Sequence, residues 1–420
     1  MQNKKINVLI HGLGSLNHGL TKKFEESELL GKIFVLSPIE PTYINCVYLG
    51  SEKNMTLGQL KSAIIENNID FAISFNELYS MSNLAEYFQK EIKIPIIEVP
   101  KDWFILESSK IKCKEFMQKN NILTADYIQI NKITEVENAI ENFGLPIVIK
   151  NNYLQAGFGS YICKDKSSAI KKAKELIKKY KFCIAEKFII GKEVSQQYLW
   201  DKNTLLPLLP VKDFKKLDGS ENAINTGSMG AYTPVLFTEK EKKLLEEYNL
   251  KISEVFNKEK PNFTGIFTTN LLYTENEIYT LEFNMRPGLP EFEVLIEHIN
   301  SDLLKLLYDC AYGNLQNSSV TYKDGITGCI CLAHPDYIKR KSKAINISLK
   351  KDISTFDENI KLNFNIINFQ KGGRIKIRTD LRFLSVLCTD KNSPFNKIYK
   401  YLETIKSLNI SYRKDIRYER

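Results

Sequence analysis

Several patterns are scarce in this chain of 420 residues, and each scarcity excludes a class of protein. No run approaches the roughly 18 consecutive apolar residues of a membrane-spanning helix. The 8 cysteines include no CxxC pair, and none of the 4 histidines stands with them at zinc-ligand spacing. The apolar stretch near Met1 is too short for a signal peptide. Without an internal repeat or a low-complexity segment, the sequence predicts a reduced, cytoplasmic, globular protein.

Arginine is absent from most of the chain. All 8 arginines lie at or after Arg286, although Lys and Arg together number 59 and the net charge is +9. Over half of that excess lies in the last 30 residues. A positive charge indicates anionic partners but does not choose among nucleic acid, a membrane surface and a phosphorylated metabolite. Arginine is expected where a bidentate fork is needed, and chance clustering with a basic tail is the alternative.

The order of apolar runs predicts several α/β domains. The chain is long enough for about two to four domains. The run INVLI at residues 6–10 precedes a glycine-rich turn and an amphipathic segment, which is the opening of a doubly wound parallel sheet. We predict such a domain over residues 1–103. Gly12 and Gly14 could bring backbone N–H groups to a phosphate, or could simply let the strand turn into the helix.

Polar residues interrupt the later apolar runs, where a plain core would have apolar ones. Lys150 ends the run PIVIK, Glu186 ends FCIAE, and Glu193 follows soon after. Glu282 and Asn284 are two residues apart on a predicted strand and therefore share one face. Two oxygen donors on one face suit a hard cation such as Mg²⁺, and a solvated strand face is the plain alternative.

These residues, in this order and at this spacing, resemble the ATP-grasp superfamily. The resemblance implies that ATP and Mg²⁺ (or Mn²⁺) are cofactors and that Glu282 and Asn284 are the metal ligands. It implies a mobile glycine loop over the phosphates and a hinge at residues 186–189 that contacts adenine. The implied cofactor-binding residues are Lys110, Lys150, Gly157, Gly159, Glu186, Lys187, Ile189 and Glu193.

Within that superfamily, the chain is similar nearly end to end to the phosphoribosylamine–glycine ligase family. The segment DFKKLDGSENAINTGSMGAYTP at residues 213–234 resembles the family pattern DHKR, DGD and NTGGMGAYSP. LEFNMRPGLPE resembles LEFN-x-RFGDPE, and both Gly372-Gly373-Arg374 and the Tyr412–Ile416 stretch resemble C-terminal motifs of the family.

The resemblance implies a fold of mixed α/β and α+β class. It places an ATP-grasp domain at residues 104–320, with a lid at about 123–190, and a C-terminal α+β domain at 321–420. The implied reaction forms an amide through an acyl phosphate, between an amino acid and an amine that are small molecules. The implied catalytic residues are Arg286, Lys150 and Asn225, and the implied substrate-binding residues are Gly12, Gly14, His18, Asp213, Lys215, Asn225, Thr226, Gly227, Met229, Arg286 and Gly288.

Departures from the family pattern concentrate on the substrate side. The family's Arg-Glu before the histidine is Leu16-Asn17 here, and its GPE is Phe75-Asn76-Glu77. The others are Asn152, Tyr153, Phe158, Phe214 and Leu289. The open alternatives are the family's own reaction, a paralogue with another amino acid or amine, a non-catalytic ATP-binding homologue and a nucleic-acid-binding protein. We expect no nucleic-acid or membrane partner, and a monomer or homodimer.

Overall fold

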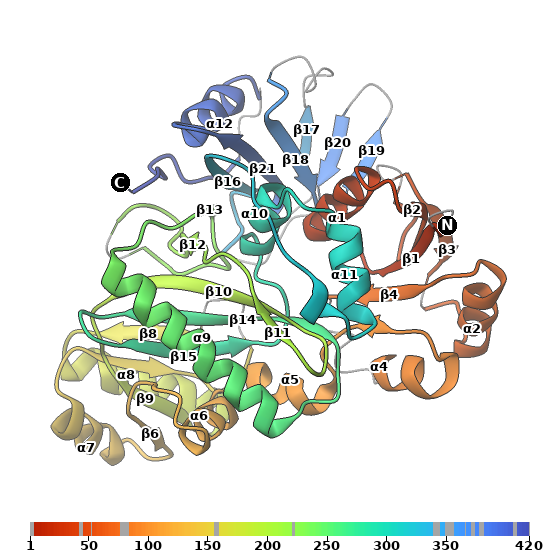
Figure 1. The fold of residues 1–420 in the computed structure, drawn as a ribbon. Coiled ribbons are helices and arrows are strands. Elements are labelled where there is room, and N and C mark those ends of the chain that lie inside the picture. Colours follow the sequence, from red (N-terminus) through yellow and green to blue (C-terminus); the bar gives the residue numbers. More distant parts are fainter. Residues whose placement is uncertain are drawn as a thin grey trace.

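Three groups of sheets and their helices make up the structure, a computed structural model (Figure 1). It describes residues 4–41, 45–51, 53–75, 84–154, 159–220, 223–338, 345–348, 357–365, 367–370, 374–377, 382–405 and 410–419. The mixed α/β fold predicted from the sequence is confirmed. Among the helices in these ranges, none has both the length and the apolar character needed to cross a bilayer.

The N-terminal part is the predicted doubly wound parallel sheet. Its strand order is β3 (Val47–Gly50), β2 (Leu30–Leu36), β1 (Ile6–His11), β4 (Phe71–Ser74) and β5 (Ile96–Ile97). Around it lie α1 (Ser15–Glu25), α2 (Leu57–Glu66), α4 (Leu84–Tyr87) and η1 (Phe88–Ile92). β1 is apolar and almost fully buried because neighbouring strands flank both of its edges and helices cover it.

Two antiparallel sheets are built from the middle of the chain. One has the order β6 (Tyr127–Ile130), β9 (Cys183–Lys187), β7 (Ile147–Lys150), β8 (Ser160–Cys163), with α7 (Thr134–Phe143) and α8 (Lys166–Tyr180) packed on it. The other has the order β11 (Leu205–Pro207), β10 (Lys192–Trp200), β14 (Gly265–Tyr273), β15 (Ile278–Asn284). The helices α5 (Lys101–Ser108) and α6 (Lys110–Lys119) precede the first of these sheets in the chain.

The helix α9 (Glu239–Glu259) closes the outer face of the β10–β14–β15 sheet. Thr238 caps its first turn through a reciprocal capping box with Glu241. Phe256 of α9 stacks on Phe267 of β14, with the ring centroids 4.6 Å apart and the planes 5° from parallel. This aromatic contact fixes the sheet from behind, so its other face is free to line a cleft.

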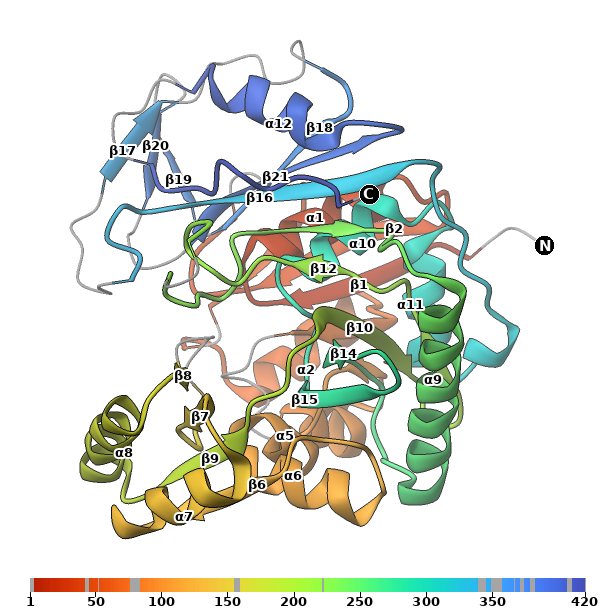
Figure 2. The same ribbon diagram turned by 90° about the vertical axis from the view of Figure 1, so that its left-hand side faces the viewer.

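The C-terminal sheet includes two strands from the middle of the chain. Its order is β12 (Lys212–Asp213), β13 (Gly230–Thr233), β16 (Ile326–Ala333), β21 (Arg382–Asp390), β18 (Ile360–Phe364), and α12 (Pro394–Leu402) packs on it. Figure 2 shows β16 and β21 crossing above the centre of the molecule. The sheet therefore spans the predicted boundary at residue 320, and the division into 1–103, 104–320 and 321–420 stays a prediction.

The remaining elements join these layers. Helix α10 (Glu291–His298) contacts α1 as well as β13, β16 and β21. After it come α11 (Leu303–Ala311) and the short 3₁₀ turn η2 (Leu315–Asn317). A small sheet of order β17 (Ile345–Ser348), β20 (Arg374–Ile377), β19 (Ile367–Gln370) lies at the periphery. The N-terminal and C-terminal parts thus meet at α10.

Gly230 tests how closely β13 packs in the C-terminal sheet. A Cβ there would lie 2.5 Å from the Cys329 carbonyl oxygen and 2.7 Å from Ile416 Cδ1. Gly230→Ala should therefore lower the free energy of unfolding by about 1–3 kcal/mol in urea denaturation. Gly58→Ala, in an open position of α2, should leave it unchanged or raise it by about 0.5–1 kcal/mol. Equal effects of the two substitutions would contradict this packing.

Candidate active site

A cavity of about 220 Å³ lies between the two central antiparallel sheets. Residues of β7 and β9 line one side of it and residues of β15 line the other, and Figure 2 shows where these strands lie. Most of the predicted cofactor and metal residues line it, together with three predicted for substrate: Lys110, Lys150, Gly159, Glu186, Lys187, Ile189, Glu193, Lys215, Asn225, Glu282, Asn284 and Arg286. Gly157 lies outside the described residues. The fold thus brings together side chains that are up to 176 positions apart, from Lys110 to Arg286.

Lysines and carboxylates form paired contacts in this cavity. Lys150 Nζ lies 2.6 Å from Glu186 Oε2, and Lys114 Nζ lies 3.4 Å from the same oxygen. Glu186 and Lys114 are almost fully buried. Although burial opposes ionisation of Glu186, the two lysines hold the pKa of its carboxyl below the ordinary value. The Glu186 carboxylate therefore keeps the Lys150 ammonium in place at the cavity wall.

The predicted metal pair lies on the opposite wall. Glu282 Oε1 accepts a hydrogen bond of 2.9 Å from Asn270 Nδ2, and Oε2 lies 3.3 Å from Lys110 Nζ. A β-bulge between Asn270 and Leu271 interrupts the register opposite Leu281, so Leu281, Glu282 and Asn284 all line the cavity. Burial opposes ionisation of Glu282, but Lys110, Lys215 and Lys150 hold its pKa well below the ordinary value.

Glu282 and Asn284 together suit a metal ion that takes its remaining ligands from water and substrate phosphates. In the described part of the chain, no group of three or more His, Cys, Asp or Glu side chains could hold a metal. One ionised carboxylate and one amide oxygen therefore suit Mg²⁺, which is usually bound by one or two carboxylates plus water and substrate phosphates. Glu282 and Asn284 are the residues that would hold it.

A second cluster of charges surrounds Lys215, next to the cavity. Lys215 Nζ lies 3.3 Å from Glu193 Oε2 and 4.0 Å from Asp213 Oδ2. Both Asp213 oxygens are buried and accept no hydrogen bond from a described residue, and the same holds for Glu291 Oε2. Burial, with the nearby Glu291 and Glu193 carboxylates, raises the pKa of Asp213 to about 7 despite Lys215. The cluster therefore holds buried carboxylate oxygens that a cationic group would satisfy.

Arg286 lines the cavity at the end of β15. Its Nε lies 3.1 Å from Glu107 Oε1, and Glu107 Oε2 accepts a 2.7 Å hydrogen bond from the Met285 N–H. A structural salt bridge is the plain alternative to a substrate contact for this arginine. The structure contains the ion pair, and Arg286 also faces the cavity, so Glu107 orients a guanidinium that a ligand can reach.

The predicted residues of the opening loop lie apart from this cavity. Gly12 and Gly14 have φ of 95° and 153°, and Gly14 is the N-cap of α1. His18 is buried beneath β18, where its Nδ1 accepts a 2.9 Å hydrogen bond from the Phe364 N–H. Burial lowers the pKa of His18 to about 3, so its imidazole is neutral. Its contact with β18 joins the two ends of the chain, and its substrate role stays a prediction.

The loop of residues 225–229 is fixed by its own hydrogen bonds. The N–H and the hydroxyl of Thr226 both donate to the Lys215 carbonyl, at 2.6 and 2.7 Å. Met229 is fully buried, and Gly288 packs against the side chain of Glu291. Of the predicted substrate residues, Thr226, Gly227, Met229 and Gly288 thus lie in or beside the segments that carry Lys215 and Arg286.

The positions that depart from the family have definite structural roles. Asn152 Oδ1 accepts hydrogen bonds from Ser109 Oγ (3.2 Å) and the Ile111 N–H (3.0 Å), which fixes the start of α6 beside Lys110. Tyr153 packs on Tyr180, and Leu16 and Asn17 are buried in the first turns of α1. Phe75 packs on Phe292, and Phe214 on Tyr232. Asn76, Glu77 and Phe158 lie outside the described residues.

Sequence reasoning missed several polar residues of the site. Lys114, Glu107 and Asn270 contact the predicted residues Glu186, Arg286 and Glu282. Ser195 hydrogen-bonds to Asn270 and to Glu291. None of these five was singled out as functional. Lys114 and Glu107 lie inside the segment that resembles the family, so their motif could have found them. Ser195 and Asn270 lie within strands and match no motif, and only their pairing across β10 and β14 reveals them.

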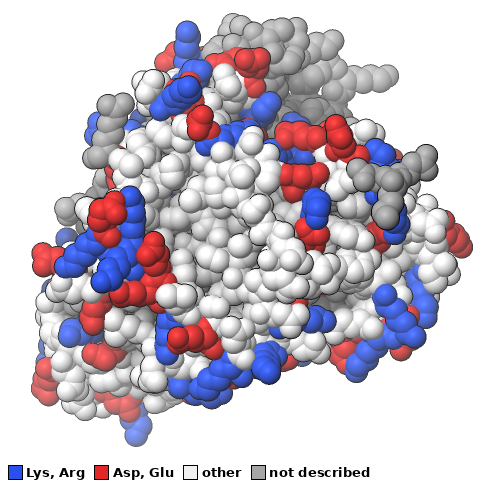
Figure 3. Space-filling view, in the orientation of Figure 1, with Lys and Arg blue, Asp and Glu red and all other residues white. Residues whose placement is uncertain are grey.

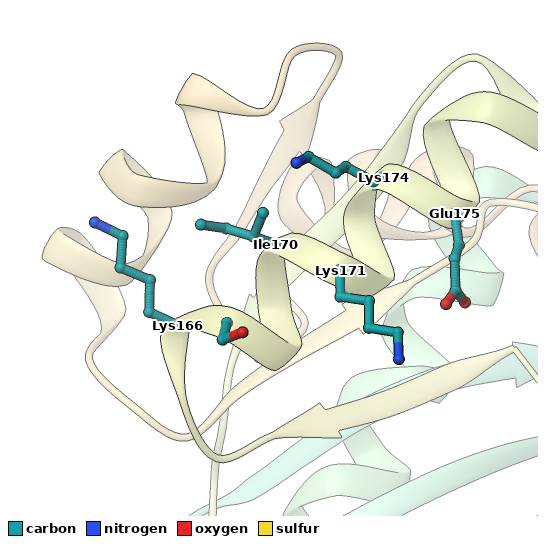
Figure 4. A pocket seen from close by; sticks show the side chains of 6 residues that line it. Lys166, Ile170, Lys171, Lys174 and Glu175 are labelled. Carbon is teal, nitrogen blue, oxygen red and sulfur yellow. The ribbon is translucent and has the colours of Figure 1, made fainter.

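A second hollow lies on the surface of α8. Figure 4 shows its lining residues, which all belong to α8: Lys166, Ser167, Ile170, Lys171, Lys174 and Glu175. Since one helix supplies every wall, no second element closes the hollow over a ligand. Elsewhere, the face drawn in Figure 3 carries intermixed basic and acidic side chains around a broad uncharged centre. A continuous basic stripe of the kind used for nucleic acid is not seen on this face.

Comparisons with known proteins agree with this geometry. Residues 108–292 match the family model of the phosphoribosylglycinamide synthetase ATP-grasp (A) domain. A phosphoribosylamine–glycine ligase of Clostridium acetobutylicum is 29% identical, over 97% of this chain and 99% of the relative. One from Fusobacterium nucleatum is 27% identical, over 97% of each chain. The chain is thus similar, along nearly its whole length, to phosphoribosylamine–glycine ligases, and its residues 108–292 carry their ATP-grasp domain.

Solved structures show the same fold. The phosphoribosylamine–glycine ligase of Thermotoga maritima aligns with a TM-score of 0.74 at 22% identity, over 98% of this chain and 100% of that one. A biotin carboxylase domain from Hydrogenobacter thermophilus aligns at 0.71 and 15% identity, over 97% and 91%. The chain is an ATP-grasp enzyme of the type that forms carbon–nitrogen bonds, and ATP-grasp enzymes use ATP and a divalent metal.

Asp213→Asn should raise the free energy of unfolding at alkaline pH. The folded carboxyl keeps its proton up to about pH 7, whereas the unfolded one releases it near the ordinary value of 3.8. Wild-type stability therefore falls as the pH rises from about 4 to 7. In urea denaturation the variant should exceed the wild type by about 1–3 kcal/mol at pH 8, and by less at pH 5.

Asp201→Asn is the matched control. Asp201 is equally buried, but its oxygens accept hydrogen bonds from the N–H groups of Asn203, Thr204 and Leu315. This variant should lose stability at both pH values because an acceptor is removed. If Asp213→Asn also lost stability, and lost more at pH 8 than at pH 5, the ionised carboxylate would be stabilising and our account of Asp213 would be wrong.

Proposed function

We propose that this protein joins glycine to phosphoribosylamine, converting ATP to ADP and phosphate with Mg²⁺ as its metal. The observation that carries the proposal is the single cavity in which Lys110, Lys150, Glu282, Asn284 and Arg286 meet. Phosphoryl transfer needs positioning and neutralisation of charge more than covalent chemistry from the protein. The lysines supply positive charge, and the bound metal adds neutralisation of phosphate oxygens.

The reaction has two steps that balance without any other reactant. The donor carboxylate oxygen attacks the γ-phosphorus of ATP, the bond to ADP breaks, and an acyl phosphate forms. The amine nitrogen then attacks the acyl carbon, phosphate leaves, and the nitrogen gives up a proton as the amide forms. In this scheme Lys150, held by Glu186, contacts the phosphates, and Arg286, held by Glu107, orients the donor carboxylate or the acyl phosphate. Asn225, on the same wall, is proposed to hydrogen-bond the reacting group.

The cluster around Asp213 supports an amino acid as donor. An α-amino acid carries an ammonium group beside its carboxylate, and buried carboxylates without donors are favourable partners for an ammonium. Asp213 and Glu291 offer such oxygens next to Lys215 and Glu193. The pair would be left unsatisfied by a donor that lacks the amino group, which is a strong basis for discrimination.

A different amine is the second candidate, and one observation favours it. The family's charged Arg-Glu pair is replaced by Leu16 and Asn17, and both are buried in the first turns of α1. Charged side chains therefore do not project from these two positions towards an acceptor. The residues proposed to contact ATP and the donor carboxylate are present in the cavity. The replacement of the charged pair therefore concerns recognition of the amine and not of ATP.

An ADP-release screen separates these possibilities. Purified protein with ATP and Mg²⁺ should release ADP only when glycine and freshly generated phosphoribosylamine are both present. If another amino acid or amine is needed, the paralogue is supported. If no member of a broad panel of amino acids and amines gives ADP, the ligase proposal fails and a non-catalytic ATP-binding homologue remains.

The metal assignment has its own test at Glu282. Glu282→Gln should lower ADP release by roughly 100-fold or more, because the site loses its one charged metal ligand. Binding of Mn²⁺ in the presence of ADP, followed by electron paramagnetic resonance, should weaken in parallel. Glu277→Gln, at the exposed turn before the same strand, is the matched control and should change neither. Unchanged Mn²⁺ binding in Glu282→Gln would refute the assignment.

A further inference from the structure

Arg382 is a partly buried cation with no counter-ion among the residues that the structure describes. It is the first residue of β21, and its Nη1 donates to three backbone carbonyls, those of Gly227, Ser228 (2.8 Å) and Leu289 (2.8 Å). Within the described ranges, no carboxylate lies at ion-pair distance from it. By contrast, Arg286 pairs with Glu107 and Arg413 with Asp415. A charge taken out of water normally has a partner of opposite sign, so this position lacks an anion.

The three carbonyls belong to the two segments that carry the predicted substrate residues. Gly227 and Ser228 lie in the loop with Asn225 and Thr226, and Leu289 follows Arg286 and Gly288 on the other segment. One guanidinium nitrogen thus joins both segments to the C-terminal sheet. The Nε and Nη2 donors have no acceptor among the described residues. A planar guanidinium fixed at one nitrogen presents the other edge in a defined direction, with two donors for one anion.

The surroundings place Arg382 beside the opening loop. Asn365 Nδ2 donates to the Arg382 carbonyl at 2.9 Å, and Asn365 Oδ1 lies 3.7 Å from the point where a Gly14 Cβ would stand. Glu293, fully buried on α10, bonds to Ser385 Oγ (2.6 Å) and to Ser15. Arg382 therefore lies where β21, α10 and the start of α1 converge.

The acidic groups nearby do not neutralise Arg382. Those that face it are Glu291 and Glu293 of α10, with Tyr337 and Cys331 as the other titratable neighbours. Neither glutamate is at ion-pair distance, and burial raises the pKa of Glu293 to about 7, so this carboxyl is partly protonated at neutral pH. An anion bound to the free edge of Arg382 would complete the balance of charge.

We propose that the free edge of Arg382 binds the anionic group of the amine substrate and so holds the amine against the segments that carry Asn225 and Arg286. This inference rests on the proposed function, since it assigns one end of the acceptor. The chemical class is a phosphate or carboxylate carried by the amine. Arg382 is a binding and positioning residue here, and it takes no part in the transfer of the phosphoryl group.

Binding of an unreactive anion tests the assignment without turnover. Ribose 5-phosphate should bind the wild-type protein in isothermal titration calorimetry, and ribose should not. Arg382→Gln should weaken the binding by about 10- to 100-fold, because charge-assisted hydrogen bonds are lost. The same titration with aspartate, and with asparagine as its uncharged control, shows whether the site prefers a carboxylate to the phosphate of ribose 5-phosphate. If neither ribose 5-phosphate nor aspartate binds the wild type, the inference fails, whatever the ADP screen shows.

Kinetics separate anion binding from simple structural support. With hydroxylamine as a neutral acceptor, amino-acid-dependent hydroxamate formation should fall much less in Arg382→Gln than amide formation with the anionic amine does. The KM for the anionic amine should rise about 10- to 100-fold with a similar kcat. Parallel loss of both activities would show that Arg382 only supports the loops, and would overturn the inference. If the wild type forms neither hydroxamate nor amide while ribose 5-phosphate still binds, the proposed function fails and the anion site stands.

Two further variants keep the test decisive if Arg382→Gln folds poorly. Arg382→Lys keeps the cation and a donor for the carbonyls but loses the planar fork, so it should fold and bind ribose 5-phosphate less tightly than wild type. Arg413→Gln removes an arginine whose charge Asp415 already balances, and its affinity for ribose 5-phosphate should match the wild type. Wild-type affinity in Arg382→Lys together with weakened affinity in Arg413→Gln would contradict the assignment.

Discussion

The pairing of lysines with carboxylates in one enclosed space is the constraint on which the rest of the structure depends. A site for a nucleoside triphosphate must concentrate positive charge. In the protein without a bound anion, however, lysines that lie close together repel one another. Glu186, Glu193 and Glu282 each lie within 3.4 Å of one or two of these lysines. The carboxylates offset the repulsion between the lysines and hold them close together, so the cavity can form in the protein alone.

The architecture around the cavity follows from that need. Each partner of a pair comes from a different element: α6 supplies Lys110 and Lys114, β7 supplies Lys150, β9 supplies Glu186 and β15 supplies Glu282. Only sheets held rigidly from behind can keep such pairs in register. The stack of Phe256 on Phe267 fixes one sheet, and the packing of α7 and α8 covers the other. The positions of the charged side chains in the cavity therefore depend on how firmly the apolar layers outside it hold the two sheets.

The sequence predicted the elements of the site better than their mutual placement. Apolar runs and terminal polar residues located β1, β7, β9 and β15 because these patterns are local. The bulge beside Leu281 was out of reach, since it depends on how β15 pairs with β14. The sequence also did not show which arginine of the C-terminal region lies beside the predicted substrate residues. Gly372 and Gly373 lie outside the described residues, Arg374 starts a peripheral strand, and Arg382 is the arginine beside the substrate segments.

The shared C-terminal sheet gives the protein an order of assembly during synthesis. The strand β13, which follows the loop of residues 225–229, pairs with β16, and β16 in turn pairs with β21. The nucleotide side of the cavity needs no residue after Arg286, so it can fold while the chain is still emerging from the ribosome. The loop that carries Asn225 reaches its final partners only after residue 382 has been made. A truncated or stalled product would thus retain the lysines of the cavity without the bonds from Arg382 to the loop of residues 225–229.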